Sequence, residues 1–463
     1  MFVKQFVDEG LGNSSYIVGS EAAGVAAVID PQRDVDRYLQ AAEGLGLRLT
    51  HVLDTHLHAD FVSGARELAA KAGLKIGASR TAEMAFEHLP LAEGDTLHLG
   101  EVVLGVVTTP GHTPEHISFT ITEPGQAQPA AIFTGGALIV GGAARTDLLG
   151  HDLTVPLARQ LYHTLHDKLL QLPDAVTVYP THGAGSFCAA PTSSDRVTSI
   201  GRERTQNNLT QARNEDEFVE LALFGLPSYP VYYKYLRGVN QRGPRVLGGV
   251  PLLQPLPPEA VRDMAAQGVA VLDVRRRQAF FESHIPNAYG IPVSAPLITW
   301  AGWLIPFGTP LILVADSPRQ REEAVRQLIR IGYDDLRGYL EGGMDAWQAA
   351  DLPVARVRTI TAAELRDWRN AGDSDQPVVL DVRQNAEWLA GHIPGAVHVE
   401  TGRLPYDELA LPTDGPVAIH CQLGNRATSA WSVLTRRGYD NLVVVDTGFD
   451  EWQAAGFEVA RGA

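Results

Sequence analysis

Histidine and aspartate alternate directly after a predicted strand in the first quarter of the chain. His56, His58 and Asp60 follow the predicted strand Leu49–Asp54 and precede a predicted helix. Side chains at alternating positions past a strand end can converge on one point, and imidazole together with carboxylate suits zinc or iron. The spacing therefore predicts a metal site at the end of this strand.

Two further histidines stand in the same kind of position. His112, in the run 110–116, follows one predicted strand, and His182 follows another. A lone histidine is usually a hydrogen-bonded polar residue, but three strand-end sites in one domain are hard to explain by packing alone. The set favours a metal site.

A different chemistry is indicated near the C-terminus, in the loop Cys421–Arg426. The cysteine follows the predicted strand Val417–His420 and precedes a predicted helix that begins near Ala427. Backbone N–H groups at a helix N-terminus stabilise a thiolate, which makes the cysteine a nucleophile. Gly424 permits the tight turn, and Arg426 is expected to order the loop and to favour an anionic substrate.

The elements around these motifs fall into two patterns. In the first half, short predicted strands such as Val25–Ile29 and Val102–Thr108 are joined by turns and alternate with helices, which predicts a mixed sandwich of sheets with outer helices. The last part contains an internal repeat, because the Asp-Val-Arg run at 273–275 recurs at 381–383. Each copy alternates short β-rich runs with helices, which predicts a parallel sheet.

Length and composition narrow the class of protein. The chain has 463 residues, enough for about three domains. A formal net charge of −16 argues against binding to nucleic acid or to anionic membrane. Two cysteines are too few for a disulfide framework, and no apolar run approaches the ~18 residues of a membrane span. We expect a cytoplasmic protein, and a homo-oligomer stays open.

The predicted domain boundaries follow the two patterns. The first domain is predicted over residues 1–241 and a linker rich in Gly and Pro over 242–258. The two repeated domains are predicted over 259–355 and 356–463.

The histidine motifs together resemble the metallo-β-lactamase superfamily, in particular its glyoxalase II and persulfide dioxygenase branch. The resemblance covers roughly the first half of the chain and implies an αββα sandwich with a metal at the sheet edges. In persulfide dioxygenases, one Fe(II) is held by the first histidine of an HxH motif, the histidine of a Pro-Gly-His motif and the aspartate of a Thr-Gly-Asp motif. The first two correspond to His56 and His112.

The sequence departs from this pattern at two positions. Gly136 stands where the resemblance places the aspartate, and Phe61 stands where two-metal members carry a histidine of the second site. Both departures argue against a dinuclear site. The remaining histidines and aspartate suit one Fe(II) or Zn(II) ion with open coordination positions. The predicted ligands are His56, His58 and His112, with Asp60 and His182 as outer or alternative ligands.

Three further residues lie near these motifs. Cys188 closely follows His182, so it is interpreted either as an apolar filler or as a relay of sulfur near the metal. The segment 199–207 is similar to the one by which related proteins engage thiol substrates. Arg202 and Arg204 in it are candidates to meet substrate carboxylates, and a solvated helix face is the alternative.

Both repeat copies resemble the rhodanese-like sulfurtransferase domain over nearly their whole length. The loop Cys421–Arg426 is one residue shorter than the loop of related phosphatases, which favours sulfane sulfur over a phosphoryl group. In the first copy Asp316 occupies the cysteine position. A carboxylate cannot carry a persulfide, so we predict that this copy is inactive.

The whole arrangement resembles bacterial fusions of a persulfide dioxygenase with a sulfurtransferase. It implies that a low-molecular-weight thiol persulfide, such as glutathione persulfide, is oxidised by O2 to sulfite at a mononuclear Fe(II) site, and that Cys421 transfers sulfane sulfur. Iron suits this oxidation because it is redox-active, whereas zinc would activate water. Two alternatives stay open: a zinc-dependent thioester hydrolase of glyoxalase II type, and a metal-free sulfur carrier or scaffold.

Overall fold

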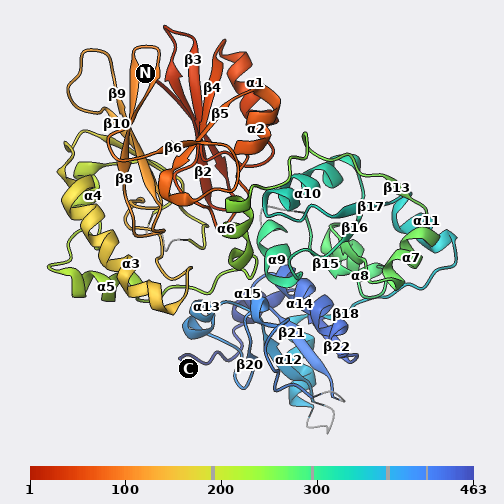
Figure 1. The fold of residues 1–463 in the computed structure, drawn as a ribbon. Coiled ribbons are helices and arrows are strands. Elements are labelled where there is room, and N and C mark those ends of the chain that lie inside the picture. The colour runs from red at the N-terminus through yellow and green to blue at the C-terminus, as the bar shows by residue number, and fades with distance from the viewer. Residues whose placement is uncertain (189–192, 294–296, 372–375, 413–414, 463) are drawn as a thin grey trace. The chain divides into compact units, whose positions relative to one another are not determined.

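The structure is a computed structural model that describes residues 1–188, 193–293, 297–371, 376–412 and 415–462 (Figure 1). Its contacts divide the chain into two compact units. The first unit contains Met1–Pro251 with the stretch Ile329–Gly332, and the second contains Leu252–Leu328 with Tyr333–Ala463. Among the described residues, no helix combines the length and the apolar character that a membrane crossing requires.

Two six-stranded sheets form the centre of the first unit. The strands of the first sheet are β1 (Phe2–Asp8), β2 (Asn13–Ser20), β3 (Val25–Ile29), β4 (Arg48–Leu53), β5 (Lys75–Ser79) and β6 (Leu89–Leu91). Those of the second are β7 (Thr96–Leu99), β8 (Val102–Thr108), β9 (Ile117–Thr122), β10 (Ala131–Gly135), β11 (Thr177–Pro180) and β12 (Thr198–Ser199). The first sheet is antiparallel from β1 to β3 and parallel from β3 to β6.

The two sheets face each other across a shared apolar core. Val18 and Leu53 of the first sheet lie in the same buried cluster as Leu104 and Phe119 of the second. A second cluster packs the first sheet against α1 and α2, and a third packs the second sheet against α3, α4 and α5. This confirms the predicted αββα sandwich, because each sheet has one face on its neighbour and one under helices.

The helices of the first unit have the following bounds. They are α1 (Asp36–Gly44), α2 (Ala65–Ala72), α3 (His151–His163), α4 (Ile200–Gln206), α5 (Glu215–Leu223) and α6 (Tyr233–Arg242), with short turns η1 (Arg80–Ala82), η2 (Thr164–Lys168) and η3 (Leu169–Gln171). The helical segment that begins with α3 is divided, because α3 ends at His163 and gives way to a π-helical and then a 3₁₀ turn.

The second unit contains two five-stranded sheets that are parallel throughout. The first sheet has the order β13-β17-β16-β14-β15, with β13 (Pro255–Leu256), β14 (Ala270–Asp273), β15 (Tyr289–Gly290), β16 (Leu311–Val314) and β17 (Leu336–Leu340). The second has the order β18-β22-β21-β19-β20, with β18 (Arg358–Ile360), β19 (Val378–Asp381), β20 (Val397–His398), β21 (Val417–His420) and β22 (Leu442–Val445).

The same strand order in both sheets confirms that the repeat is a repeated domain. The central strands β16 and β21 are fully buried, as expected for parallel strands covered by helices on both faces. The helices are α7 (Pro258–Ala266), α8 (Arg277–Glu282), α9 (Leu297–Leu304), α10 (Pro318–Arg330), α11 (Gly343–Ala349), α12 (Ala362–Asn370), α13 (Asn385–Ala390), α14 (Asn425–Arg436) and α15 (Gly448–Ala454), with the turn η4 (Thr401–Arg403). Residues 242–258, predicted as a linker, include β13 and the first residue of α7.

Candidate metal centre and sulfur-transfer loop

The histidines of the first unit come from three strand ends that the sandwich brings together. β4 leads into the loop that carries His56 and His58, the connection between β8 and β9 carries His112, and β11 leads to His182. The loops are joined by backbone hydrogen bonds, for example from Ile117 N–H to the carbonyl of Thr55 at 2.8 Å. All four imidazoles are buried.

One group of possible ligands consists of three imidazoles. The ligand atoms of His56, His112 and His182 lie within 4.8 Å of one another, and the Nε2 atoms of His56 and His182 are 3.4 Å apart. A metal-binding histidine ordinarily has its second ring nitrogen held by a protein group. Here Nδ1 of His56 hydrogen-bonds to Thr55 Oγ1 at 2.8 Å, and Nδ1 of His112 to the carbonyl of Arg145 at 2.6 Å. Nδ1 of His182 hydrogen-bonds to Asn13 Oδ1 at 3.2 Å.

Burial keeps two of these rings neutral. It lowers the pKa of His56 well below the usual range and that of His112 to about 3, and the neighbouring imidazoles act in the same direction. Only a neutral imidazole can bind a metal ion. The two rings are therefore in the form that a metal centre requires.

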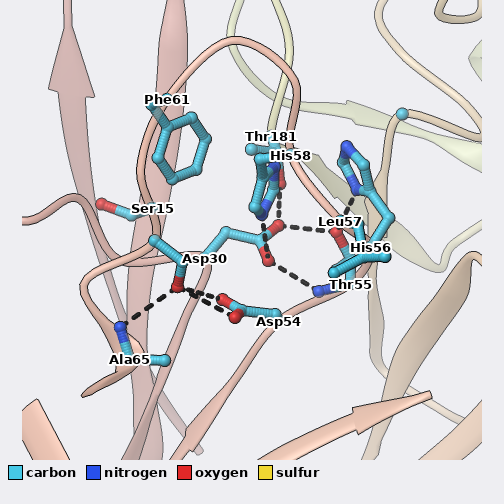
Figure 2. Close-up of polar contacts among 12 residues, drawn as sticks. Ser15, Asp30, Asp54, Thr55, His56, Leu57, His58, Phe61, Ala65 and Thr181 are labelled. Carbon is cyan, nitrogen blue, oxygen red and sulfur yellow. Dashed lines mark hydrogen bonds and ion pairs between the residues drawn. The ribbon is translucent and has the colours of Figure 1, made fainter. Parts of the chain in front are cut away.

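His58 is paired with a carboxylate and is not part of the three-imidazole group. Its Nε2 lies 3.2 Å from Oδ1 of Asp30, which also accepts hydrogen bonds from the backbone and hydroxyl of Thr55 (Figure 2). Burial opposes a charge on His58, but the carboxylates around it, first of all Asp30, outweigh burial and raise its pKa. The structure thus places His182 beside His56 and His112, and pairs His58 with Asp30.

Two further groups of possible ligands share these residues. His58 lies within ligand distance of Asp60 and His182, and also of Asp30 and Asp54. Asp60 accepts a hydrogen bond from Asn13 Nδ2 at 2.6 Å, and its Oδ2 lies 3.4 Å from His182 Nδ1. Asp60 therefore contacts His182 from the side opposite to the three Nε2 atoms, as an outer partner would.

Gly136 adjoins the ring of His112, and the side chains around it leave no room for a further side chain. Its N–H donates to His116 Nε2 at 3.0 Å, and a Cβ on Gly136 would lie 2.6 Å from Cδ2 of His112 and 2.9 Å from Cβ of Ala144. An aspartate would therefore clash in this arrangement. The residues present fit one ion held by three imidazoles, with open positions left for substrate.

Phe61 lies where a second-site histidine was expected. Its ring stacks on His58 with the centroids 4.1 Å apart (Figure 2). An apolar ring offers no ligand atom, so this position supplies nothing to a second ion.

Cys188 is fully buried at the edge of this centre. Burial and then the charge of Asp60 raise the pKa of its thiol well above the usual range, so the thiolate that a sulfur relay needs is disfavoured. Its carbonyl accepts from the N–H of Arg145 at 2.7 Å, and the carbonyl of Arg145 in turn holds His112. These contacts favour a structural role.

The two arginines proposed for substrate binding lie on α4. Arg202 pairs with Asp195 at 2.8 Å, and Arg204 pairs with Asp174 and donates to the carbonyl of Leu172 at 3.0 Å. In the described part of the chain, their contacts are with these neighbours and not with the histidine centre.

In the second unit, Cys421 directly follows β21 and is 1% exposed. The N–H of Gly424 donates to its Sγ at 3.0 Å, and Gly424 has φ +96°, a conformation that favours glycine. The loop therefore directs a backbone donor at the sulfur, as the sequence predicted for a thiolate.

Arg426 forms a two-pronged ion pair with Glu387 of α13, with N–O distances of 2.5 and 2.7 Å. Burial opposes its charge, but Glu387 and the nearby Cys421 outweigh burial and raise the pKa of Arg426. Behind the loop, Arg383 pairs with Asp381 at 2.7 Å and donates to Gln422 Oε1 at 3.1 Å. Arg426 is thus held close to the loop by an acidic partner.

The equivalent segment of the first copy is built differently. Val314 of β16 pairs with Asp273 as His420 of β21 pairs with Asp381, so Ala315, and not Asp316 as predicted, holds the position of Cys421. α10 begins at Pro318, two residues after Asp316, and the N–H of Asp316 donates to Gln320 Oε1 at 2.7 Å. Asp316, Arg321 and Tyr339 line a cavity of about 360 Å³. The segment between β16 and α10 has three residues, 315–317, and no glycine, where the second copy has four residues, the last of them Gly424, between β21 and α14.

Sequence reasoning missed the residues that hold the imidazoles from outside. Asn13, Thr55 and Arg145 come from three separate segments, and each offers a common polar group. Thr55 directly precedes His56, which is a signal that could have found it. Asn13 and the carbonyl of Arg145 carry no such signal in the sequence.

Comparison with known proteins gives the following matches. The family model of the metallo-beta-lactamase superfamily matches residues 7–182, and that of the rhodanese-like domain matches 256–350 and 361–455. The chain is 32% identical over 195 residues to persulfide dioxygenase ETHE1, mitochondrial, of Homo sapiens (42% of this chain, 69% of the relative). It is 34% identical over 242 residues to a hydroxyacylglutathione hydrolase of Rhodospirillum rubrum (48% of this chain, 78% of the relative).

A solved structure extends the likeness beyond the first unit. The crystal structure of a metallo-beta-lactamase from Staphylococcus aureus subsp. aureus COL matches with a TM-score of 0.67 and 30% identity, over 73% of this chain and 98% of that chain. The chain therefore belongs to the metallo-β-lactamase superfamily and carries two rhodanese-like domains after that domain. Within the superfamily, its relatives include persulfide dioxygenase ETHE1.

Proposed function

We propose that the chain combines two sulfur reactions. The first unit oxidises a low-molecular-weight thiol persulfide to sulfite with O2, and Cys421 transfers sulfane sulfur. In the oxidation, RSSH, O2 and water give RSH and sulfurous acid, so that the terminal sulfur is oxidised and O2 is reduced. The observation that carries this proposal is the group His56, His112 and His182, in a relative of persulfide dioxygenase ETHE1.

The three imidazoles would hold one ion and leave positions open for substrate. An iron(II) ion held there would supply redox chemistry and a binding place for sulfur and O2. The chain's own part is to keep the rings of His56 and His112 neutral by burial and to fix their orientation through Thr55 and the carbonyl of Arg145.

For sulfur transfer, Cys421 would act as the nucleophile. Its thiolate attacks the outer sulfur of a donor, a new S–S bond forms, and the donor leaves with the electron pair of the broken bond. Sulfite can then take the outer sulfur from the Cys421 persulfide to give thiosulfate and the free thiolate. The N–H of Gly424, 3.0 Å from Sγ, stabilises the anionic sulfur before and after this transfer.

Joining both activities in one chain would favour the second reaction following the first. Sulfite released by the first unit arises at a raised local concentration near Cys421, as for any two sites on one chain. The proposed thiol is glutathione, since a relative acts on hydroxyacylglutathione by its name. A cytoplasmic location and a homo-oligomer stay predictions from the sequence.

The hydroxyacylglutathione hydrolase relative supports a second candidate, a zinc-dependent hydrolysis of a glutathione thioester. A metal-free sulfur carrier or scaffold is the third, and Gly136 supports it. The three candidates differ in metal content and in O2 uptake.

The test is metal analysis of the purified full chain, supplied with Fe(II) under anaerobic conditions, followed by O2 uptake with glutathione persulfide. We expect one iron per chain and O2 uptake. H182Q should lose most of the bound metal, whereas H58Q, a matched buried histidine, should keep it. Bound zinc with thioester hydrolysis and no O2 uptake would favour the hydrolase, and a protein without metal or O2 uptake would favour the scaffold.

A further inference from the structure

The three carbonyl groups at the start of the Cys421 loop all point away from the sulfur. The carbonyl of Cys421 accepts from the N–H of Phe449 at 2.8 Å, and that of Gln422 accepts from the N–H of Asp450 at 3.4 Å. Both donors belong to α15 of the same copy. The third carbonyl, that of Leu423, has a donor from elsewhere.

That donor is Arg277, in the first turn of α8 of the first copy. Its Nη1 donates to the carbonyl of Leu423, and its Nε lies 3.2 Å from Oδ1 of Asp446, which follows β22. The Arg277 side chain is 21% exposed, and a Cβ on Gly424 would collide with its guanidinium. Arg277 is thus held in one orientation by a carboxylate on one side and by the loop on the other.

The carbonyl of Leu423 and the N–H of Gly424 belong to one peptide unit. Because that unit is planar and trans, its C=O and N–H point in opposite directions. A donor that holds the carbonyl outward therefore turns the N–H inward, where it lies 3.0 Å from Sγ of Cys421. Rotation of this unit would instead bring a carbonyl oxygen to the sulfur and destabilise an anion there.

We propose that the cysteine-free first copy takes part in sulfur transfer by the second, since Arg277 fixes the Leu423–Gly424 peptide unit so that its N–H faces the Cys421 sulfur. Arg277 is a positioning residue, because it acts through the loop and does not contact the sulfur. This inference rests on the proposed sulfur transfer by Cys421.

Other contacts hold α14 of the second copy against the first copy, as the role of Arg277 requires. Ser429 of α14 donates to the carbonyl of Gly290 at 3.0 Å, and Arg436 at the other end of α14 donates to the carbonyl of Asn287 at 2.6 Å. The helix that begins at the loop is therefore held at two points by the first copy. The residue of the second copy that corresponds to Arg277 is Asn385, which carries no charge.

The test compares R277A, R277K and R276A in the full chain. Arg276 is the adjacent, exposed arginine of the same segment. R276A therefore removes one positive charge, as R277A does, and serves as its control. Two readouts are followed: alkylation of Cys421 by iodoacetamide, measured on the Cys421 peptide by mass spectrometry over a range of pH, and sulfur transfer from thiosulfate to cyanide. R277A should slow both about tenfold at neutral pH, less than the loss of a direct donor to an anion.

The pH profile separates positioning from a purely structural role. In R277A the rise of alkylation should move to higher pH, R277K should regain part of the rate, and R276A should match the wild-type protein. An unchanged profile in R277A, or equal behaviour of R277A and R276A, would overturn the inference. A wild-type protein that transfers no sulfur would refute the proposed function, while the alkylation profiles would still decide on Arg277.

Discussion

The two rhodanese-like copies share the same supporting frame. Asp273 and Arg275 pair at 2.7 Å in the first copy, as Asp381 and Arg383 do in the second. In each copy the indole N–H of a late tryptophan donates to a backbone carbonyl, at 2.9 Å and 2.8 Å respectively. These groups bind the ends of strands and helices together, so they are required by the fold whether or not a copy carries a cysteine.

The copies differ in where the helix begins after the central strand. In the second copy α14 begins at Asn425, and the residues between Cys421 and Asn425 form an open loop with its Gly424 N–H on the sulfur. In the first copy only residues 315–317 lie between β16 and α10, and none of them is a glycine. The comparison shows that the chemistry resides in a few loop residues, and that a cysteine alone would not recreate it.

The largest expected effect is that of C421S. Sulfur transfer should fall roughly 10³-fold or more, because neither copy has another cysteine in the sequence, while O2 uptake by the first unit should be unchanged. Thiosulfate–cyanide transfer and an oxygen electrode measure the two activities. C188S is the matched control, and it should keep sulfur transfer. Transfer retained by C421S would show that the Cys421 loop is not what separates the two copies.

A smaller effect is expected for E387Q on α13. The change leaves Arg426 without its carboxylate partner, and a partly exposed pair of this kind is worth about 1 kcal/mol. Sulfur transfer should fall roughly fivefold, mainly through a higher KM for the anionic donor, as Arg426 loses its fixed position. E282Q, an exposed glutamate at the end of α8 in the first copy, should have no effect, and an equal fall in both variants would remove the special role of the ion pair.

The two buried aspartates should respond differently to pH. Burial opposes the charge of Asp381, but His420 and Arg383 outweigh it and lower its pKa, so its contribution to stability is present above the unfolded pKa near 3.8 and is lost as the pH falls. For Asp273, burial and the nearby Asp316 outweigh Arg275 and raise the pKa, so its contribution is present below the unfolded pKa and is lost as the pH rises. At pH 7, D381N should therefore destabilise its copy by about 1 kcal/mol more than D273N does.

Hydrogen exchange measured on peptides of β19 and β14 reports on the two copies separately. The excess loss of protection in D381N should shrink as the pH approaches 3. An equal loss of protection in D381N and D273N at pH 7 would show that the two aspartates contribute equally to the stability of their copies.

The smallest effect is expected for A315C in a C421S background. The new cysteine should give no measurable sulfur transfer, since the loop between β16 and α10 is one residue shorter than the loop of the second copy and has no glycine to direct an N–H at the sulfur. The thiosulfate–cyanide assay used for C421S is the measurement. Transfer in this double variant would show that the residue type, and not the loop, separates the copies.

Much of this fold could be predicted from the sequence because its signals are local. The strands Val102–Thr108 and Val417–His420 have the predicted bounds, and the repeat predicts the two parallel sheets of the second unit. The break after α3 at His163 could not be predicted, since the apolar pattern continues through it.

The site could be predicted only in part. The motifs identify which histidines gather, but the orientation of each ring depends on partners from other segments. Asp30, directly after β3, decides that Nε2 of His58 is paired with a carboxylate. Arg277 could not be found either, because its role depends on a loop far along the chain.

The closeness of Gly136 to the ring of His112 has a consequence for how this centre can change. Replacing an aspartate by glycine at that position only removes atoms, whereas the reverse change needs the backbone or the His112 ring to move first. Single substitutions therefore lead more easily into the three-imidazole arrangement than out of it. A lineage that reaches this arrangement is expected to keep it unless several neighbouring positions change together.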